Sequence, residues 1–260
     1  MHAPNGRRGD GLRARSSTIL GPVRRPLFPV LLSVLLLSGC AGLELPDLSS
    51  YDFPALPTTT SAAPTGDAAT ALAALPVKGR APKTGYGREQ FGQRWADVDR
   101  DGCDQRNQVL ARDLTSVEYK PGTHDCVVLS GALLDPYTGD GVPFLRGEAT
   151  SADVQIDHVV ALSNAWQTGA QQLDEDTREL LANDPLNLLA VDGPTNGSKG
   201  DGDAATWLPP SRGYRCAYVA RQVAVKATYG LWVTAAESEA IARVLEDCPG
   251  EPLPVSALAG

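Results

Sequence analysis

The stretch V-Q-I-D-H-V-V-A-L, residues 154–162, decides the fold prediction. Its β-branched residues, bounded by polar ones, predict a short strand. The stretch L-N-L-L-A-V at 186–191 predicts a second strand, and residues 174–183 between the two predict an acidic helix. We expect a Gly-containing loop and a short helix to follow, up to about residue 206. This order of elements predicts an α+β domain.

The first of these strands carries two adjacent polar residues, Asp157 and His158, within apolar sequence. Neighbours on a regular strand point to opposite faces, so both side chains reach one ligand only at a strand end or a bulge. Farther along the chain come Asn187, Asn196 and Lys199. An imidazole base, oxygen donors for a metal and an ammonium for a phosphate together indicate metal-assisted phosphodiester cleavage. Taken singly, the two Asn residues are also typical of turns, and Lys199 of a solvated surface.

Several blocks of this sequence resemble the HNH endonuclease superfamily. The resemblance is greatest to exported actinobacterial members, which are related to the C-terminal nuclease domain of modification-dependent restriction enzymes. It covers most of residues 86–248, and its strength lies in the order and spacing of the blocks. The blocks are C-D-Q-R-N at 103–107, D-P-Y-T-G at 135–139, I-D-H-V-V-A-L at 156–162, N-D-P-L-N-L-L-A-V at 183–191, N-G-S-K-G-D-G-D at 196–203 and W-L-P-P at 207–210.

The resemblance implies a small ββα-metal (His-Me finger) core surrounded by helices, with a role for each candidate residue. Asp157 would be the first metal ligand, and Asn196, at the last position of the H-N-H pattern, the second. His158 would be the general base that activates water, while Asn187 would orient His158 and tie the loop. Lys199 would contact a phosphate. A site with few protein ligands suits Mg²⁺, with Mn²⁺ or another divalent ion as an alternative.

The resemblance also implies hydrolysis of DNA, with RNA left open, to give 5′-phosphate ends. The chain has a net charge of −8, and residues 1–39 hold six Arg and one Asp, so the rest of the chain has a net charge of −13. This balance favours another class of function, since binding nucleic acid through bulk electrostatics needs clustered Lys and Arg. A nucleic-acid function would rest on a local site, with Arg94, Arg106 and Arg112 as the candidates for local positive charge. Two alternatives therefore stay open. One is a catalytically silent lipoprotein that serves as a binding or scaffold module of the cell envelope. The other is an enzyme that hydrolyses a different phosphodiester, such as a wall-polymer linkage.

Residues 1–39 predict a signal peptide. Several Arg residues precede an uncharged, apolar run at 26–39 that is too short to span a membrane as a helix. The run leads into L-S-G-C at 37–40, which resembles the lipobox of bacterial lipoproteins and predicts lipidation of Cys40. We therefore expect a protein anchored by lipid to the outer face of the cell membrane, or a secreted one if Cys40 is not lipidated. General secretory and twin-arginine export both stay open.

Composition predicts the remaining boundaries. Residues 40–82 are rich in Pro, Ser, Thr and Ala and keep no hydrophobic period, which predicts a flexible tether. Residues 83–250 predict one folded nuclease-like domain, and 251–260 a tail. Further helices are expected at 107–114, 215–229 and 234–247, the last behind a capping box that starts at Thr234. The last two should form an antiparallel hairpin.

The cysteines of this domain are Cys103, Cys126, Cys216 and Cys248. An even number in an exported chain predicts two disulfides, for which three pairings are possible. We favour 103–126 and 216–248, because each closes a moderate loop and the second joins the outer ends of two expected helices. Zinc binding is the rival interpretation, which the absence of C-x-x-C spacing disfavours.

An acidic turn precedes the first of these cysteines. Asp97, Asp99 and Asp101, followed by Gly102, match the first half of a calcium loop. Position 12 falls on Gln108, where such loops need a bidentate Glu. The sequence therefore favours an Asp-rich turn before a helix, with a structural calcium ion as the alternative.

Overall fold

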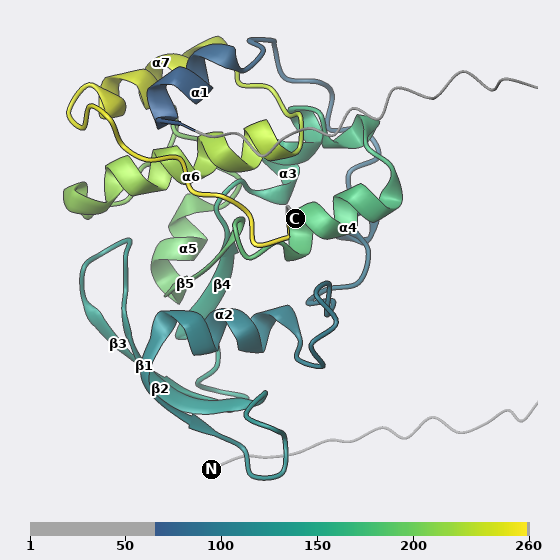
Figure 1. Ribbon diagram of the computed structural model, residues 1–260, viewed down its shortest axis with the longest axis vertical. Helices are drawn as coiled ribbons and strands as arrows, with labels where there is room; N and C mark the ends of the chain where they lie inside the picture. Colours follow the sequence, from purple (N-terminus) through teal and green to yellow (C-terminus); the bar gives the residue numbers. More distant parts are fainter. Residues whose placement is uncertain (1–65, 259–260) are drawn as a thin grey trace, which may run out of the picture. The chain divides into compact units, whose positions relative to one another are not determined.

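The computed structural model describes residues 66–258 (Figure 1). The predicted signal peptide, Cys40, most of the predicted tether and the last two residues lie outside this range. The described residues form a mixed helix and sheet domain, which confirms the α+β class, and they contain the disulfides Cys103–Cys126 and Cys216–Cys248 in the favoured pairing. Within the same range, no helix combines the length and the apolar character that crossing a membrane requires.

Helices and strands are intermixed along the chain. The strands are β1 (Leu114–Tyr119), β2 (Val128–Leu134), β3 (Gly141–Leu145), β4 (Val154–His158) and β5 (Leu188–Asp192). The α-helices are α1 (Ala68–Ala74), α2 (Gln105–Asp113), α3 (Leu162–Gln167), α4 (Glu175–Asn183), α5 (Gly193–Lys199), α6 (Arg215–Thr228) and α7 (Ala235–Leu245). Short 3-10 helices are η2 (Arg88–Phe91), η3 (Ala170–Gln172) and η4 (Arg212–Tyr214).

Strands β4 and β5 form an antiparallel two-stranded sheet between the helices and the second sheet (Figure 1). Strand β4 ends at His158, opposite Leu188, and not at the expected residue 162. After His158 the Val159 amide donates to the Asn187 carbonyl oxygen at 2.8 Å, and the chain then turns into α3. The strand therefore ends at the residues that carry the predicted chemistry.

Helix α5 begins directly after β5, so the Gly-containing loop that the sequence predicted here is the first turn of a helix. The Asp192 carboxylate caps this turn by accepting from the Thr195 amide at 2.8 Å. Pro194 in the same turn has no amide to satisfy, which suits it to a helix start. Asn196 and Lys199 consequently lie on α5 itself.

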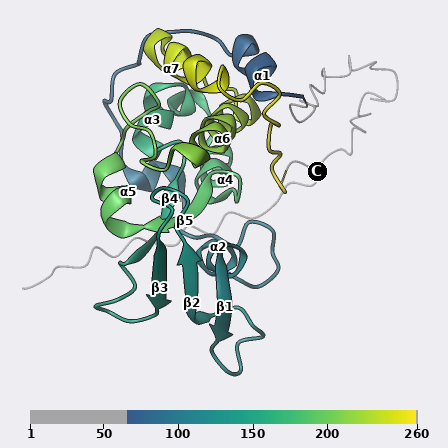
Figure 2. The same ribbon diagram turned by 90° about the vertical axis from the view of Figure 1, so that its left-hand side faces the viewer.

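A three-stranded antiparallel sheet in the order β1-β2-β3 was not among the elements that the sequence predicted. Helix α2 packs against this sheet and also against the β4–β5 pair (Figure 2). The interface is apolar and buried. It contains Val109, Leu110, Leu114, Val128, Phe144, Ile156 and Leu188.

Helices α6 and α7 form the antiparallel pair that the sequence predicted. The Cys216–Cys248 disulfide joins the start of α6 to the chain just after α7. The capping box is present, because the Thr234 hydroxyl accepts from the Glu237 amide and the Glu237 carboxylate accepts from the Thr234 amide. Between the two helices Lys226 pairs with Glu237 at 2.9 Å, with both side chains fully buried.

Helix α1 packs against α6 and α7, although it lies within residues 40–82, where the sequence predicted a tether (Figure 1). The C-terminal tail packs beside it. The Ala68 amide donates to the Glu251 carbonyl oxygen at 2.9 Å, and the Leu253 amide donates to the Gly66 carbonyl oxygen at 3.1 Å. In the described residues, packing against the domain therefore extends to both sides of the predicted range 83–250. Ala-rich composition concealed the helix, because α1 buries few large side chains.

Candidate active site

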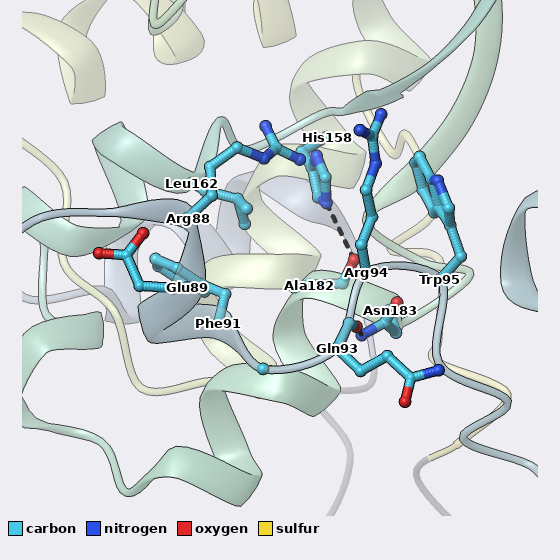
Figure 3. A pocket seen from close by; sticks show the side chains of 11 residues that line it. Arg88, Glu89, Phe91, Gln93, Arg94, Trp95, His158, Leu162, Ala182 and Asn183 are labelled. Atoms are coloured by element: carbon cyan, nitrogen blue, oxygen red, sulfur yellow. Dashed lines mark hydrogen bonds between the residues drawn. The ribbon is translucent and has the colours of Figure 1, made fainter.

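The end of β4 places His158 between two cavities. The first, of about 290 Å³, is lined by Arg88, Arg94 and Trp95 among others and is called the Trp95 cavity (Figure 3). The second, of about 280 Å³, is called the Asn196 cavity, and its lining also includes Asp157. His158 lines both cavities, so its ring borders open space even though only 7% of the residue is exposed.

One hydrogen bond orients the His158 ring. Its Nε2 lies 2.9 Å from the carbonyl oxygen of Ala182, near the end of α4 (Figure 3). A carbonyl oxygen only accepts, so Nε2 carries the ring proton and Nδ1 has a lone pair. Burial, together with the positive charge of Arg88, lowers the pKa of His158 to about 3. The neutral ring therefore offers Nδ1 as a proton acceptor.

Asp157 is buried and holds two donors. Its Oδ2 accepts from the Tyr137 hydroxyl at 2.6 Å, and Lys199 Nζ lies 3.0 Å from Oδ1 and 2.9 Å from Oδ2. The same ammonium donates to the His158 carbonyl oxygen at 2.8 Å. This differs from the expected phosphate contact of Lys199, whose side chain is completely buried. Burying a carboxylate costs free energy unless a cation pairs with it. Lys199 is that cation for Asp157.

Asn187 is completely buried at the start of β5 and contacts backbone atoms. Its Oδ1 accepts from the Val160 amide at 2.8 Å, and its Nδ2 lies 3.3 Å from the Val160 carbonyl oxygen and 3.2 Å from that of Leu181. Asn187 thus ties the loop after His158 to the end of α4. No hydrogen bond joins it to the His158 ring within the described part of the chain, where the Ala182 carbonyl is the ring's partner.

Asn196 projects from α5 into the second cavity. Its Nδ2 donates to Gln155 Oε1 at 2.9 Å. Its side-chain oxygen, Oδ1, accepts no hydrogen bond from residues 66–258. The structure therefore brings Asp157, His158 and Asn196 together around one cavity, although β4 and α5 are separated along the chain by α3, α4 and β5.

Two residues that line this site, Arg88 and Trp95, were not candidates in the sequence analysis, and Arg94 was considered there only as a source of local positive charge. They lie on and just after η2, before the blocks that carry the chemistry, and two of them are arginines without a recognisable pattern. The two arginines line both cavities. A weak signal was present, because Arg94-Trp95 pairs a cation with an aromatic ring shortly before the acidic turn.

The acidic turn does bring its carboxylates together. Asp97, Asp99 and Asp101 can each offer an oxygen such that all three lie within 4.8 Å of one another. Gln108, at position 12 of the calcium pattern, donates to Asp99 at 2.9 Å. Backbone amides that follow donate to the Asp97 carboxylate, as in an Asp-rich turn.

Comparison with known sequences gives the family. Residues 104–244 match the family described as the C-terminal domain of GmrSD restriction endonucleases. The chain belongs to this family. The matched residues of the GmrSD C-terminal domain include β1 to β5 and α5, and with them Asp157, His158 and Asn196. The segment that carries Arg88, Arg94 and Trp95 precedes the match.

A relative of this GmrSD-type domain is an uncharacterized secreted protein of Arthroderma benhamiae. It is 36% identical over 195 residues, which is 74% of this chain and 90% of the relative. No solved structure matches the chain.

Proposed function

We propose that this protein is a divalent-metal-dependent endonuclease that hydrolyses DNA. The family description supports nuclease chemistry, since it names a domain of restriction endonucleases. The observation that carries the proposal is the shared cavity. Two oxygen donors, Asp157 and Asn196, face the same space as a neutral imidazole whose Nδ1 is available.

In the proposed reaction, His158 Nδ1 takes a proton from a water molecule as the water oxygen attacks phosphorus. As the new P–O bond forms, the bond from phosphorus to the 3′ oxygen breaks, and the 3′ oxygen takes a proton from solvent water, which leaves a 5′-phosphate and a 3′-hydroxyl. His158 then releases its proton to solvent. The hydrogen bond from Nε2 to the Ala182 carbonyl keeps the ring in the required orientation. It also favours the charged ring after proton transfer, because a carbonyl oxygen stabilises an N–H donor that has become more positive.

The donor set suits a hard divalent cation. Among residues 66–258, Asp157 Oδ1 accepts from Lys199 alone, so a lone pair remains, and Asn196 Oδ1 accepts no hydrogen bond. Carboxylate and amide oxygens are the ligands that Mg²⁺ and Mn²⁺ prefer, and Mg²⁺ keeps most of its waters. A cation bound there would supply positive charge to the leaving oxygen.

We further propose that the protein works outside the cytoplasm. Two disulfides are typical of chains that fold in an oxidising compartment, and the relative from Arthroderma benhamiae is called secreted. Residues 1–39 would then be the signal peptide and Cys40 the lipidated residue, which would anchor the chain to the outer face of the cell membrane. The DNA met there would be extracellular.

A plasmid assay tests the proposed activity. With Mg²⁺ or Mn²⁺ the purified protein should convert supercoiled plasmid to nicked and linear forms, and EDTA should stop the conversion. His158→Ala should lower the rate at least about a hundredfold, as expected for removal of a general base. His124→Ala is the matched control, because His124 is exposed in a turn away from both cavities.

Plasmid that stays intact with every divalent ion, in a folded protein with both disulfides formed, would contradict the endonuclease and favour the envelope scaffold. Cleavage that is insensitive to EDTA would contradict the metal role of Asp157 and Asn196.

A further inference from the structure

The segment from Arg88 to Ala96, here called the arginine loop, is anchored on α4. Arg178 Nε donates to the Gln90 carbonyl oxygen at 2.6 Å. Asn183 holds the loop at a second point, since its Nδ2 donates to the Gln93 carbonyl oxygen at 3.1 Å and its Oδ1 accepts from the Ala96 amide at 3.0 Å.

Helix α4 holds His158 as well, through the carbonyl oxygen of Ala182, the neighbour of Asn183. The arginine loop and the His158 ring are therefore fixed by the same end of one helix. Contacts with α4 therefore fix the position of the loop relative to the ring.

Two guanidinium groups of this loop stand beside His158. Arg88 and Arg94 line both the Trp95 cavity and the Asn196 cavity, and both side chains are exposed. Neither makes a hydrogen bond or an ion pair to another residue of the described range. In Figure 3 the side chain of Arg88 runs toward the His158 ring, and Glu89 points away from it. An acidic chain thus presents two uncompensated positive charges at the mouth of the candidate site.

Trp95 lies beside Arg94 (Figure 3). The Cζ atom of Arg94 is 5.1 Å from the centroid of the Trp95 ring, within the range of a cation–π contact. The Trp95 and His158 rings are nearly parallel, at 9°, with centroids 6.2 Å apart. Trp95 also packs against the core beneath α2 and has a φ of 59°, a conformation that L residues seldom adopt. Tertiary contacts therefore hold the ring in place beneath Arg94.

We propose that Arg88 and Arg94 bind the backbone phosphates at and next to the bond that is cleaved, and that Trp95 is the positioning residue for Arg94. The proposal rests on the proposed nuclease function and gives the phosphate role to these arginines in place of Lys199. A guanidinium offers paired N–H donors that match two phosphate oxygens. Phosphate contacts carry no information on base identity, so these two arginines would bind nucleic acid of any sequence equally.

Binding to labelled DNA without catalysis tests the phosphate contacts. Full-length His158→Ala protein in EDTA is titrated with a fluorescent duplex of random sequence at several salt concentrations. Arg88→Gln and Arg94→Gln should each weaken binding about tenfold at low salt. Each should also reduce the slope of log affinity against log salt by about 1. Arg243→Gln on α7 is the control, because Arg243 is exposed and lines neither cavity.

A salt slope that stays unchanged in the Arg88→Gln/Arg94→Gln double variant overturns the proposal. Separate readouts distinguish its failure from that of the nuclease function. Normal plasmid cleavage by the double variant contradicts the phosphate site alone. A protein that binds DNA through these arginines but cleaves no plasmid contradicts the nuclease function alone.

The role of Trp95 has its own test. Trp95→Phe keeps an aromatic face and should retain the salt slope, whereas Trp95→Leu keeps apolar packing without that face and should behave like Arg94→Gln. Combined with Arg94→Gln, Trp95→Leu should add little further loss of affinity. Both changes remove the same contact, that of the Arg94 guanidinium with a phosphate. A loss that adds fully to that of Arg94→Gln shows a general packing role and overturns the positioning role.

Discussion

Lys199 places a positive charge where the proposed metal would also need to approach Asp157. Its ammonium is buried and compensates the carboxylate in the structure described. The lysine and a divalent cation would therefore act on the same charge. We expect Lys199 to stabilise the buried Asp157 carboxylate in the absence of metal and to compete with a metal ion for it.

Replacing this lysine separates the two effects. In EDTA, Lys199→Met should destabilise the protein by about 3 kcal/mol, the usual result of leaving one partner of a buried pair unpaired. Millimolar Mn²⁺ should then raise the melting temperature of the variant more than that of the wild type, because the carboxylate regains a positive partner. Equal shifts in both proteins would show that Asp157 does not bind the ion.

The sequence predicted the identity of the central residues and little about their contacts. Asp157, His158 and Asn196 stood out because their order and spacing match a family, and the structure places them around one cavity. The direction of Lys199 was not predictable, since a helix position does not show whether a long side chain turns inward. Arg88 and Arg94 lack any pattern, and only the packing of their loop on α4 brings them to the site.

Among the elements, α6 and α7 share a buried ion pair that makes their packing sensitive to pH. Burial raises the pKa of Glu237, and the charge of Lys226 opposes that rise. The pKa of Lys226 is lowered, again mainly by burial. Each partner therefore depends on the other to stay charged inside the domain.

Lys226→Met should destabilise the protein by about 3 kcal/mol at pH 8, because Glu237 is left as a buried, unpaired carboxylate. The raised pKa of Glu237 rises further in this variant. As the pH falls through that pKa, Glu237 takes up a proton in the folded state. In the unfolded state it does so only near its ordinary pKa of 4.5, so the lower pH favours folding of the variant. The deficit relative to wild type should therefore shrink at pH 5, as measured by urea unfolding.

The Lys226→Met/Glu237→Gln double variant is the control for this titration. It carries no ionisable group at the pair, so the pair adds no pH dependence to the stability of this variant between pH 8 and pH 5. A deficit of Lys226→Met that does not change with pH would show that Glu237 is not the group responsible.

The sequence predicted helices α2, α4, α6 and α7 because each has a cap or an apolar periodicity that acts locally. It did not predict β1 to β3, and β1 shows why. The pairing of β1 with β2 shifts between Thr115 and Glu118, and Ser116 has a φ of 51°. A bulge of this kind breaks the alternation of buried and exposed residues that identifies a strand. The partner strands, and not the local sequence, determine the structure here.

At the scale of the whole molecule, helix α1 makes the folded unit longer than composition predicted. Leu72 of α1 is buried against the layer of α6 and α7, and the tail around Leu253 covers the same region. The domain should therefore depend on residues outside 83–250.

A truncation test follows from this. A fragment of residues 66–260 should melt cooperatively, whereas a fragment of residues 83–260 should be less stable by at least about 3 kcal/mol, the typical cost of one buried Leu. Leu72→Asp in the longer fragment should cause a loss of the same order, while Thr70→Ala, at an exposed position of α1, is the milder control. Equal melting temperatures of the two fragments would restore the boundary at residue 83.

The hydrogen bond between Leu253 and Gly66 has a mechanical consequence. The described part of the chain begins at this seam on the helical layer, and none of the residues that line the Asn196 cavity comes from α1, α6 or α7. A force applied to the chain before residue 66 therefore acts first on the backbone hydrogen bonds between residues 66–68 and 251–253. The residues that line the cavity lie outside these contacts. If such a force breaks these hydrogen bonds, we expect the Asn196 cavity to keep its shape.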